Sequence, residues 1–318
     1  MEISEKNIKN KGEILDNKYI IEQYLDYGGH SEVYKVKDIT SNKIYALKLF
    51  NEKDVSFENE IKINKIIKGY GNQNYIKFID SSNGKSEFSY IVLEFASKGS
   101  VLNFITYNNK GLNEKLCKFL FTKILIIVQS LHKIGICHRD LKLENFLFDG
   151  DNFNIKISDF GLSSQIIKDN KGKPQKQKGE VGTSFCKAPE MYIKENYDGE
   201  KADIFSLGVI LFNIRTGKMG FKEAKEDNKY YKYIKEGKTK VYWQKIEKNM
   251  KINDLTEEFK NLFIKIVTYN PEIRPSIEEI YNDIWLKEIR DLNDKELKDY
   301  DKELIKELKM REQLLITL

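Results

Sequence analysis

The pattern of apolar residues changes near Gly99, and this change constrains the fold more than any other feature of the chain. Before it, stretches such as YIIEQYL, EVYKVKD and KIYALKLF alternate or run apolar between polar turns, as strands do. Only VSFENEIKINKII has helical spacing there. After it, LCKFLFTKILIIVQSLHKIG and KADIFSLGVILFNIRTG are apolar on almost all sides, which indicates buried helices. The sequence therefore predicts an α+β fold, with a small antiparallel sheet and one helix followed by a mainly helical part.

Composition excludes several classes of protein. Of 318 residues, 40% are hydrophobic, which is enough for a sizeable core, and the net charge of +5 is a small excess of 54 basic over 49 acidic residues. Because both signs are interspersed along the chain, we expect neither nucleic-acid nor membrane binding. Three cysteines without paired spacing argue against a disulfide framework or a zinc site. We expect a monomer in a reducing compartment, either the cytoplasm or the nucleus.

Both ends of the chain differ from its middle. Residues 1–17 are polar and are predicted to be a leader, whereas residues 287–318 are dense in charge and predicted to be helical. Leu297, Tyr300, Leu304 and Leu308 can line one face of that helix. Two interpretations stay open: a solvated helix docked on the body, or a helix for a partner or for autoregulation. Its balanced charge argues against a calmodulin target, which would be basic.

The first hairpin and the elements after it are suited to binding phosphate. YLDYGGHSEVY occupies the frame of a glycine-rich loop, although Gly28 is the only one of three frame glycines present. YALKLF then places Lys48 on a strand, and FENEIKI places Glu60 on the following helix. A partly buried lysine that reaches phosphates needs a carboxylate to hold its ammonium group, and a strand lysine and a helix glutamate can form that pair.

Two later motifs carry groups for metal binding and proton handling. CHRDLKLEN contains Asp140, Lys142 and Asn145, and SDFG contains Asp159, with a predicted β-hairpin between them. The oxygens of Asn145 and Asp159 are ligands that Mg²⁺ accepts. Asp140 can orient an incoming hydroxyl group, and Lys142 can neutralise charge on a group in transfer. Each motif alone is as consistent with a surface lysine, a helix end or a turn, but their order and separation are very improbable by chance.

With these motifs the sequence resembles the eukaryotic protein kinase family over about Tyr19 to Leu286. The resemblance implies a bilobal protein-kinase-like fold with a catalytic domain over 18–286, an N-lobe over about 18–95 and a C-lobe over about 97–286. It also implies ATP with Mg²⁺, or Mn²⁺ as a substitute. Two further positions match: Asp203 as a brace of the catalytic loop, and Arg274 as the partner of Glu190 in KAPE.

The resemblance also indicates the type of kinase. Lys142 in HRDLKLEN and Thr183 in VGTSFCKAPE stand where serine/threonine kinases have them, and Thr183 is expected to link Asp140 with Lys142. ENEI, ENFLF and the segment from Gly220 to Ile246 are similar to the calcium/calmodulin-dependent and calcium-dependent group. No EF-hand follows, so calcium sensing by this chain is not expected. The partners implied are proteins with Ser/Thr acceptors.

By the same resemblance, the adenine site consists of apolar roof and floor positions, a gatekeeper and a hinge whose backbone binds the base. With the loop positions and Lys48, the nucleotide-binding residues are Leu25, Gly28, Ser31, Val33, Ala46, Leu93, Glu94, Ala96 and Leu147. Core packing alone would also explain the apolar members of this set.

The chain departs from the family pattern in its nucleotide loop, spine and activation segment. Asp26 and Ser31 replace two loop glycines, and Asn64 falls where the family has an apolar spine residue, so we expect a less favoured active helix position. No serine or threonine lies between Ser164 and Thr183. Glu180 is the nearest carboxylate that could stand in for a phosphate, which would make activity independent of loop phosphorylation.

Substrate preference and activity are less constrained by the residues. Glu144 can attract a basic residue near the acceptor, whereas Ser100 replaces a glutamate common in arginine-directed kinases. A mild preference for basic substrates follows. The main interpretation is an active serine/threonine kinase, and the alternative is a pseudokinase that acts as a nucleotide-binding scaffold.

Overall fold

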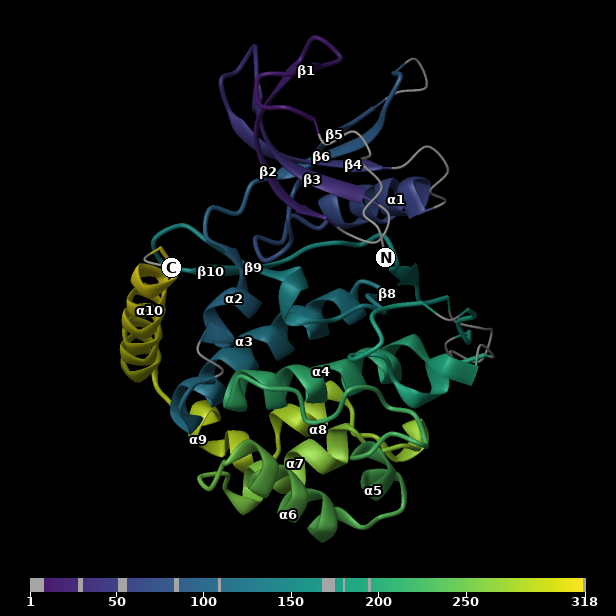
Figure 1. Cartoon of the computed structure of the whole chain (residues 1–318), viewed down its shortest axis with the longest axis vertical. Helices are drawn as coiled ribbons and strands as arrows, with labels where there is room; N and C mark the ends of the chain where they lie inside the picture. Colours follow the sequence, from purple (N-terminus) through teal and green to yellow (C-terminus); the bar gives the residue numbers. More distant parts are fainter. Residues whose placement is uncertain are drawn as a thin grey trace. The chain divides into compact units, whose positions relative to one another are not determined.

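The computed structural model describes residues 9–27, 31–50, 56–82, 86–107, 110–167, 175–179, 181–193 and 196–316 (Figure 1). The chain forms two compact units, which we describe separately. The first lies within Met1–Lys98 and includes Lys156–Gly161, and the second comprises Gly99–Ile155 and Leu162–Leu318. Within the described ranges, no helix combines the length and apolar character needed to cross a lipid bilayer.

The first unit is an antiparallel sheet with one helix. Its strands have the order β1-β2-β3-β4-β6-β5. Their bounds are β1 Ile14–Leu15, β2 Tyr19–Tyr27, β3 Ser31–Asp38, β4 Ile44–Phe50, β5 Phe78–Ser81 and β6 Ser89–Glu94, and the helix α1 spans Ser56–Lys68. The sheet and helix predicted from the apolar pattern are confirmed. Part of the segment predicted as a leader joins the sheet, because β1 pairs with β2 and Leu15 is buried.

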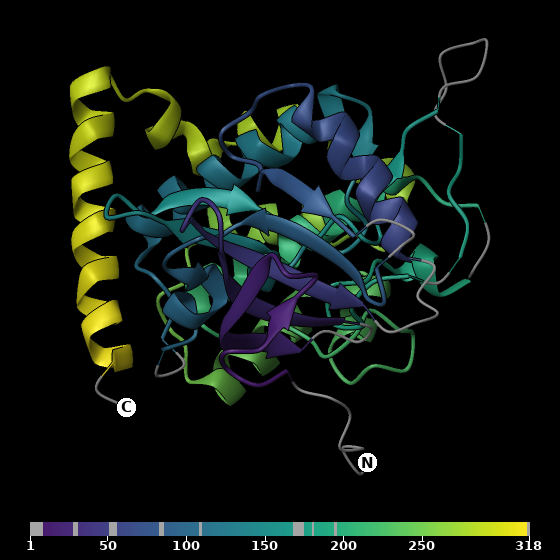
Figure 2. The same ribbon diagram turned by 90° about the horizontal axis from the view of Figure 1, so that it is seen from above.

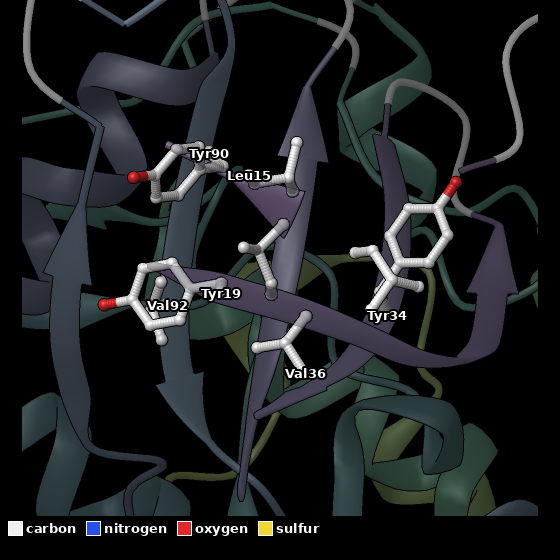
Figure 3. Close-up of a cluster of buried hydrophobic side chains, with 8 residues drawn as sticks. Leu15, Tyr19, Tyr34, Val36, Tyr90 and Val92 are labelled. Carbon is white, nitrogen blue, oxygen red and sulfur yellow. The ribbon is translucent and has the colours of Figure 1, made fainter. Parts of the chain in front are cut away.

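One face of this sheet is an apolar core. Tyr34 lies opposite Leu47, and Leu47 opposite Val92, so these side chains share a face. Figure 3 shows that cluster, in which Tyr19 and Tyr90 meet edge to face with ring centroids 6.0 Å apart. The alternation of strand side chains turns every second residue of β3, β4 and β6 to the opposite face.

That opposite face carries the residues predicted to bind nucleotide. Val33 lies opposite Lys48, and Ala46 lies opposite Leu93. Because Ala46 and Lys48 are two residues apart on β4, all four side chains point to the same side of the sheet. Asp26, opposite Val33, belongs to this side as well. The alternation of side chains along each strand thus places the core residues on one face of the sheet and the predicted nucleotide-binding residues on the other.

The six residues Lys156–Gly161 begin within β10 (Asn154–Ile157) and lie in the predicted C-lobe, but they belong to the first unit. Ile157 forms a parallel bridge with Tyr75, and its N–H donates to the carbonyl of Asn74 at 2.8 Å. Lys156 pairs with both carboxylate oxygens of Glu94 at 3.1 Å. The structure thus groups Lys156–Gly161 with the first unit, whereas the sequence assigned them to the C-lobe. Pairing between residues so far apart in the chain produces no recognisable pattern in the sequence around them.

The second unit is mainly helical, as predicted (Figure 1). Its α-helices are α2 Val101–Ile105, α3 Glu114–Lys133, α4 Gly199–Thr216, α5 Tyr231–Lys235, α6 Thr239–Met250, α7 Glu257–Ile266, α8 Ile277–Tyr281, α9 Lys287–Arg290 and α10 Asp294–Ile316. Short 3₁₀ helices are η2 Leu143–Asn145, η3 Pro189–Ile193, η4 Pro271–Ile273 and η5 Ile284–Leu286. Its short strands are β7 Gly99–Ser100, β8 Ile136–Cys137, β9 Phe146–Asp149 and β11 Ser164–Gln165, and the first two residues of β10 belong to it as well.

Helix α4 forms the centre of this unit. Asp198 caps its first turn by accepting from two backbone N–H groups, and Gly217 ends it in the left-handed conformation. Every residue from Ala202 to Thr216 is buried, which confirms the helix that the sequence shows as apolar on all sides. Gly208 is required where α7 ends, because a Cβ atom there would lie 2.6 Å from a methyl carbon of Val267.

The charged tail folds as the long helix α10, which lies alongside α3 and α2 (Figures 1 and 2). Leu304 and Leu308 are buried, and the ring centroid of Tyr300 lies 5.6 Å from that of Phe119 in α3. The predicted apolar face is confirmed, and it docks on the chain's own second unit.

Charge pairs flank this apolar contact. Lys115 and Lys123 of α3 each have the ammonium nitrogen 2.5 Å from a carboxylate oxygen of α10, on Glu303 and Asp301 respectively. Because all four side chains are over one third exposed, solvent screens these pairs and they contribute little to stability. They do favour one register of α10 against α3.

A buried arginine makes the strongest polar contact of the tail. Arg311 of α10 is 6% exposed. Its Nη1 donates to the carbonyl oxygens of Phe104 at 2.9 Å and Lys110 at 3.0 Å, and its Nη2 donates to that of Gly111 at 2.9 Å. Nε donates to Glu307 at 2.8 Å. The guanidinium group thus satisfies carbonyls at the end of α2 and in the segment after it.

Replacing Arg311 by methionine should lower the free energy of unfolding by ~3 kcal/mol, because several buried carbonyls would lose a charged donor. Chemical denaturation followed by circular dichroism measures this change. Lys309→Met is the matched control, since Lys309 is exposed on the same helix. Equal loss of stability in both variants would contradict the anchoring role of Arg311.

Candidate active site

In the first unit, an ion-pair cluster forms around Lys48. Its ammonium nitrogen lies 2.7 Å from Oε2 of Glu60 on α1 and 2.7 Å from Oδ1 of Asp159. The side chain of Glu60 is fully buried, whereas that of Asp159 is 41% exposed. Three predicted site residues, from a strand, a helix and a loop, therefore meet at one nitrogen.

Electrostatics keep Lys48 charged. Burial by itself lowers the pKa of Lys48, but the carboxylates of Glu60 and Asp159 outweigh it and raise that pKa above its ordinary value. The charge is thus present at neutral pH, although the nitrogen is almost enclosed. Gly161 leaves room for the cluster, because a Cβ atom there would lie 3.0 Å from Oε2 of Glu60.

In the second unit, the loop before and within η2 groups the other predicted catalytic residues. Oδ1 of Asp140 accepts from the backbone N–H of Thr183 at 2.6 Å, and Oδ2 lies 3.0 Å from Nζ of Lys142. Nζ of Lys142 also donates to the hydroxyl of Thr183 at 2.8 Å. The side-chain amide of Asn145 donates to the carbonyl of Asp140 at 2.9 Å. The expected link from Thr183 to both residues is present.

A buried carboxylate fixes the backbone of this loop. Both oxygens of Asp203 accept at 2.7 Å, one from the N–H of His138 and one from the N–H of Arg139. Arg139 has a φ of +65°, a left-handed conformation that a non-glycine residue holds only under tertiary constraint. The predicted brace is confirmed by these bonds. The predicted partner of Arg274 is also confirmed, since its Nη1 lies 2.7 Å from Oε1 of Glu190.

A family model described as the protein kinase domain matches residues 19–286. The chain belongs to the protein kinase family. This match confirms the predicted family and the predicted fold, with its sheet unit and its helical unit, and it covers nearly the same residues as the predicted catalytic domain.

Several curated relatives are CBL-interacting protein kinases of Oryza sativa and Arabidopsis thaliana. The chain is 30% identical over 290 residues to CBL-interacting protein kinase 11 of Oryza sativa subsp. japonica, covering 89% of this chain and 54% of that protein. It is 31% identical over 288 residues to CBL-interacting protein kinase 26 of the same plant, with 88% and 54% covered. CBL-interacting serine/threonine-protein kinase 15 of Arabidopsis thaliana is 29% identical over 287 residues, with 88% and 63% covered. The chain thus spans little more than half the length of the first two.

The predicted adenine residues of the kinase domain are placed on several elements. Leu25 lies on β2, Ser31 and Val33 on β3, Ala46 on β4, Leu93 and Glu94 on β6, Ala96 just after it, and Leu147 on β9. Val33, Ala46 and Leu93 share one face of the sheet, whereas Leu147 belongs to the second unit. Gly28 and Glu180 lie outside the described residues. The roles of all these residues stay predictions.

Several supporting residues escaped the sequence motifs. Lys156 donates to Glu94 and to the carbonyl of Gln73 at 3.1 Å, which ties the predicted hinge residue to the strand before SDFG. Nε2 of His132 lies 2.8 Å from Oδ2 of Asp203 and donates to it, because an ionised carboxylate only accepts. The separation in sequence between the partners of such a contact does not predict that they meet. The LHKIGICHRD run, in which His132 precedes the catalytic motif, was the only available signal.

The kinase domain has donors that fit Mg²⁺. The family implies a nucleotide with this ion, and a hard cation of this size takes carboxylate, amide and phosphate oxygens with few protein ligands. Asp159 and Asn145 offer a carboxylate and an amide oxygen. The amide nitrogen of Asn145 donates to the carbonyl of Asp140, and the metal-binding roles of Asn145 and Asp159 stay predictions.

The unusual spine residue Asn64 is buried in α1 at 2% exposure. Its amide nitrogen donates to the carbonyl of Glu60 at 2.9 Å, one turn earlier in the same helix. This bond satisfies the donor locally, and it joins Asn64 to the residue that holds Lys48. Bonds of this kind compete with the helix ladder and bend helices slightly.

Asn64→Leu should raise the free energy of unfolding by about 1 kcal/mol, because an apolar side chain suits that packed position better. We also expect higher basal activity and a tighter apparent affinity for ATP. Differential scanning fluorimetry and initial rates at several ATP concentrations measure these effects. Asn282→Leu, at an exposed position of the second unit, is the control. Unchanged activity and ATP affinity in Asn64→Leu would refute the effect on α1.

Proposed function

We propose that this chain is an active protein serine/threonine kinase that transfers the γ-phosphoryl group of Mg-ATP to hydroxyl groups of protein substrates. The observation that carries the proposal is the contact of Thr183 with both Asp140 and Lys142. These contacts hold a carboxylate and an ammonium group beside each other, which supports a role in orienting a hydroxyl group for phosphoryl transfer.

Each group has a distinct task in this proposal. Lys48, held by Glu60, binds phosphate oxygens, and Asp159 with Asn145 holds the metal ion that neutralises charge on the phosphates. Asp140 accepts the hydrogen bond of the substrate hydroxyl and orients its oxygen for attack. Lys142 stabilises the negative charge that develops during transfer.

We propose further that activity does not require phosphorylation of the activation segment. No serine or threonine is available between Ser164 and Thr183. The guanidinium Nε of Arg139 donates to the carbonyl of Leu162 at 2.7 Å. Gln177 exchanges two backbone hydrogen bonds with Tyr197, at 2.7 and 3.0 Å. Protein groups therefore already hold Arg139 and one part of this segment.

For the tail, we propose a role as part of the catalytic body rather than as a calmodulin target. The apolar face that such a partner would need, with Leu304 and Leu308, packs on α3 and α2. An intracellular location is also proposed, because Cys117, Cys137 and Cys186 are all free and buried.

Phosphate transfer to a basic protein substrate from radiolabelled ATP tests the proposed activity. Asp140→Asn and Lys48→Met should each reduce the rate at least about a hundredfold, since each removes a group that acts in the transfer step. Both variants should keep the thermal stability needed to show that they fold. A wild-type rate no greater than that of the variants would favour the scaffold alternative.

Treatment of the purified kinase with a phosphatase tests the activation segment. Activity should fall by less than about twofold, because Arg139 donates to the carbonyl of Leu162 at 2.7 Å and to the hydroxyl of Tyr197 at 3.5 Å, and neither contact needs a phosphate. Mass spectrometry confirms removal of phosphate, and a kinase known to need a phosphorylated loop serves as the control. A large loss of activity that ATP preincubation restores would contradict this proposal.

A further inference from the structure

The segment from residue 228 to residue 251 carries an excess of positive charge. Between residues 228 and 251 there are eight lysines and two glutamates, an excess of six positive charges, whereas the whole chain has an excess of five. The rest of the chain is therefore close to neutral. This segment contains α5 and α6. Its excess of lysine is not obvious in the sequence, because acidic and basic residues are interspersed over the chain as a whole.

Folding brings one lysine from each of these helices to the same aromatic ring. The ammonium nitrogens of Lys232 on α5 and Lys245 on α6 lie 5.3 and 5.5 Å from the ring centroid of Tyr233. Lys229 lies 5.3 Å from that of Tyr230. We name these five residues the basic surface. Cation–π contacts hold its three ammonium groups in place.

Within the described part of the chain, no carboxylate forms an ion pair with a lysine of the basic surface, although Glu236 interacts with Lys232 at longer range. Glu236 pairs with Lys238 at 2.8 Å, and Glu247 pairs with Lys260 at 2.7 Å, so both glutamates of the segment have other lysines. Among the residues that the structure describes, no carboxylate oxygen lies within 4.0 Å of Nζ of Lys229, Lys232 or Lys245. Three neighbouring positive charges are thus left for a ligand from outside.

This surface rests on a rigid base. Tyr231, between its members, is fully buried, with its ring centroid 4.9 Å from Phe221 and 5.9 Å from Phe205 of α4. Arg274, which pairs with Glu190, lies 5.1 Å from the ring of Phe205. The basic surface and the KAPE segment therefore share one aromatic core, and neither has to be ordered when a ligand binds.

We propose that the basic surface docks an acidic segment of a protein substrate, at a distance from the hydroxyl that receives the phosphate. The proposal rests on the proposed kinase function for the identity of the partner as a substrate. The proposed interaction is one of charge complementarity. Carboxylates of the substrate would supply the negative charges with which Lys229, Lys232 and Lys245 can form ion pairs. A substrate would then combine a basic residue near the acceptor, opposite Glu144, with an acidic segment elsewhere.

Two other anionic partners fit the surface less well. The ammonium groups lie over the faces of Tyr230 and Tyr233, so nucleic-acid bases could stack there only by displacing them. A membrane-binding face usually inserts apolar side chains, and none of the exposed large apolar residues of the described chain lies between residues 221 and 251.

Binding of a fluorescein-labelled polyglutamate peptide to the full chain tests the surface directly. The measurement uses the Asp140→Asn variant, so that it does not depend on phosphate transfer. We expect binding that weakens about tenfold in K229Q/K232Q/K245Q and is unchanged in K295Q/K298Q/K309Q, which removes three exposed lysines of α10. No binding, or equal weakening in both triple variants, would overturn the proposal.

A second measurement separates a substrate from other anions. A basic acceptor peptide fused to a glutamate-rich segment should show a KM about tenfold lower than the peptide alone, and K229Q/K232Q/K245Q should abolish only this difference. Phosphatidylserine vesicles and polyuridylate compete as alternative ligands, and stronger binding of either than of polyglutamate would refute an acidic protein partner. If the wild-type chain transferred no phosphate to either peptide, the proposed kinase function would be contradicted. The polyglutamate binding of the Asp140→Asn variant would still stand as a test of the basic surface.

Discussion

The carboxylate of Asp203 is fully buried in α4, and it accepts hydrogen bonds from the backbone of His138 and Arg139 and from the ring of His132. A buried carboxylate without donors would be very unfavourable, so its three donors and the helix that carries it stabilise one another. The left-handed backbone at Arg139 is held by this arrangement, and the position of Asp140 follows from it. The order of the catalytic loop therefore depends on a helix that begins about sixty residues later in the sequence.

A comparable dependence exists in the first unit. Lys48 keeps its charge because Glu60 and Asp159 compensate for burial, and each of these partners comes from a different element. If α1 moved away, the ammonium group would lose its buried partner. An ion pair of this kind contributes little to the free energy of unfolding, but whether it forms depends strongly on the position of the helix. Asn64, one turn after Glu60, lies where that position can be altered.

The second unit combines a rigid interior with two charged surfaces of different character. The lysines of α3 meet carboxylates of α10 within the chain, and Arg311 closes the contact through backbone carbonyls. The lysines of the basic surface have no such partner among the described residues. Similar residue types therefore serve internal docking in one place and are left for an external ligand in the other.

The sequence by itself determined the fold class, the family and the candidate site residues, because periodicity and motif spacing are local properties. The sheet, α1, the buried α4 and the residues Lys48, Glu60, Asp140, Asn145 and Asp159 could all be predicted in this way. Only the tertiary structure decided that Leu15 belongs to the core, that Lys156–Gly161 joins the first unit, and that Arg311 anchors the tail. It also decided that Lys229, Lys232 and Lys245 converge on two tyrosines. Each of these results depends on contacts between residues distant in the chain or on separate elements, and neither periodicity nor a motif records such contacts.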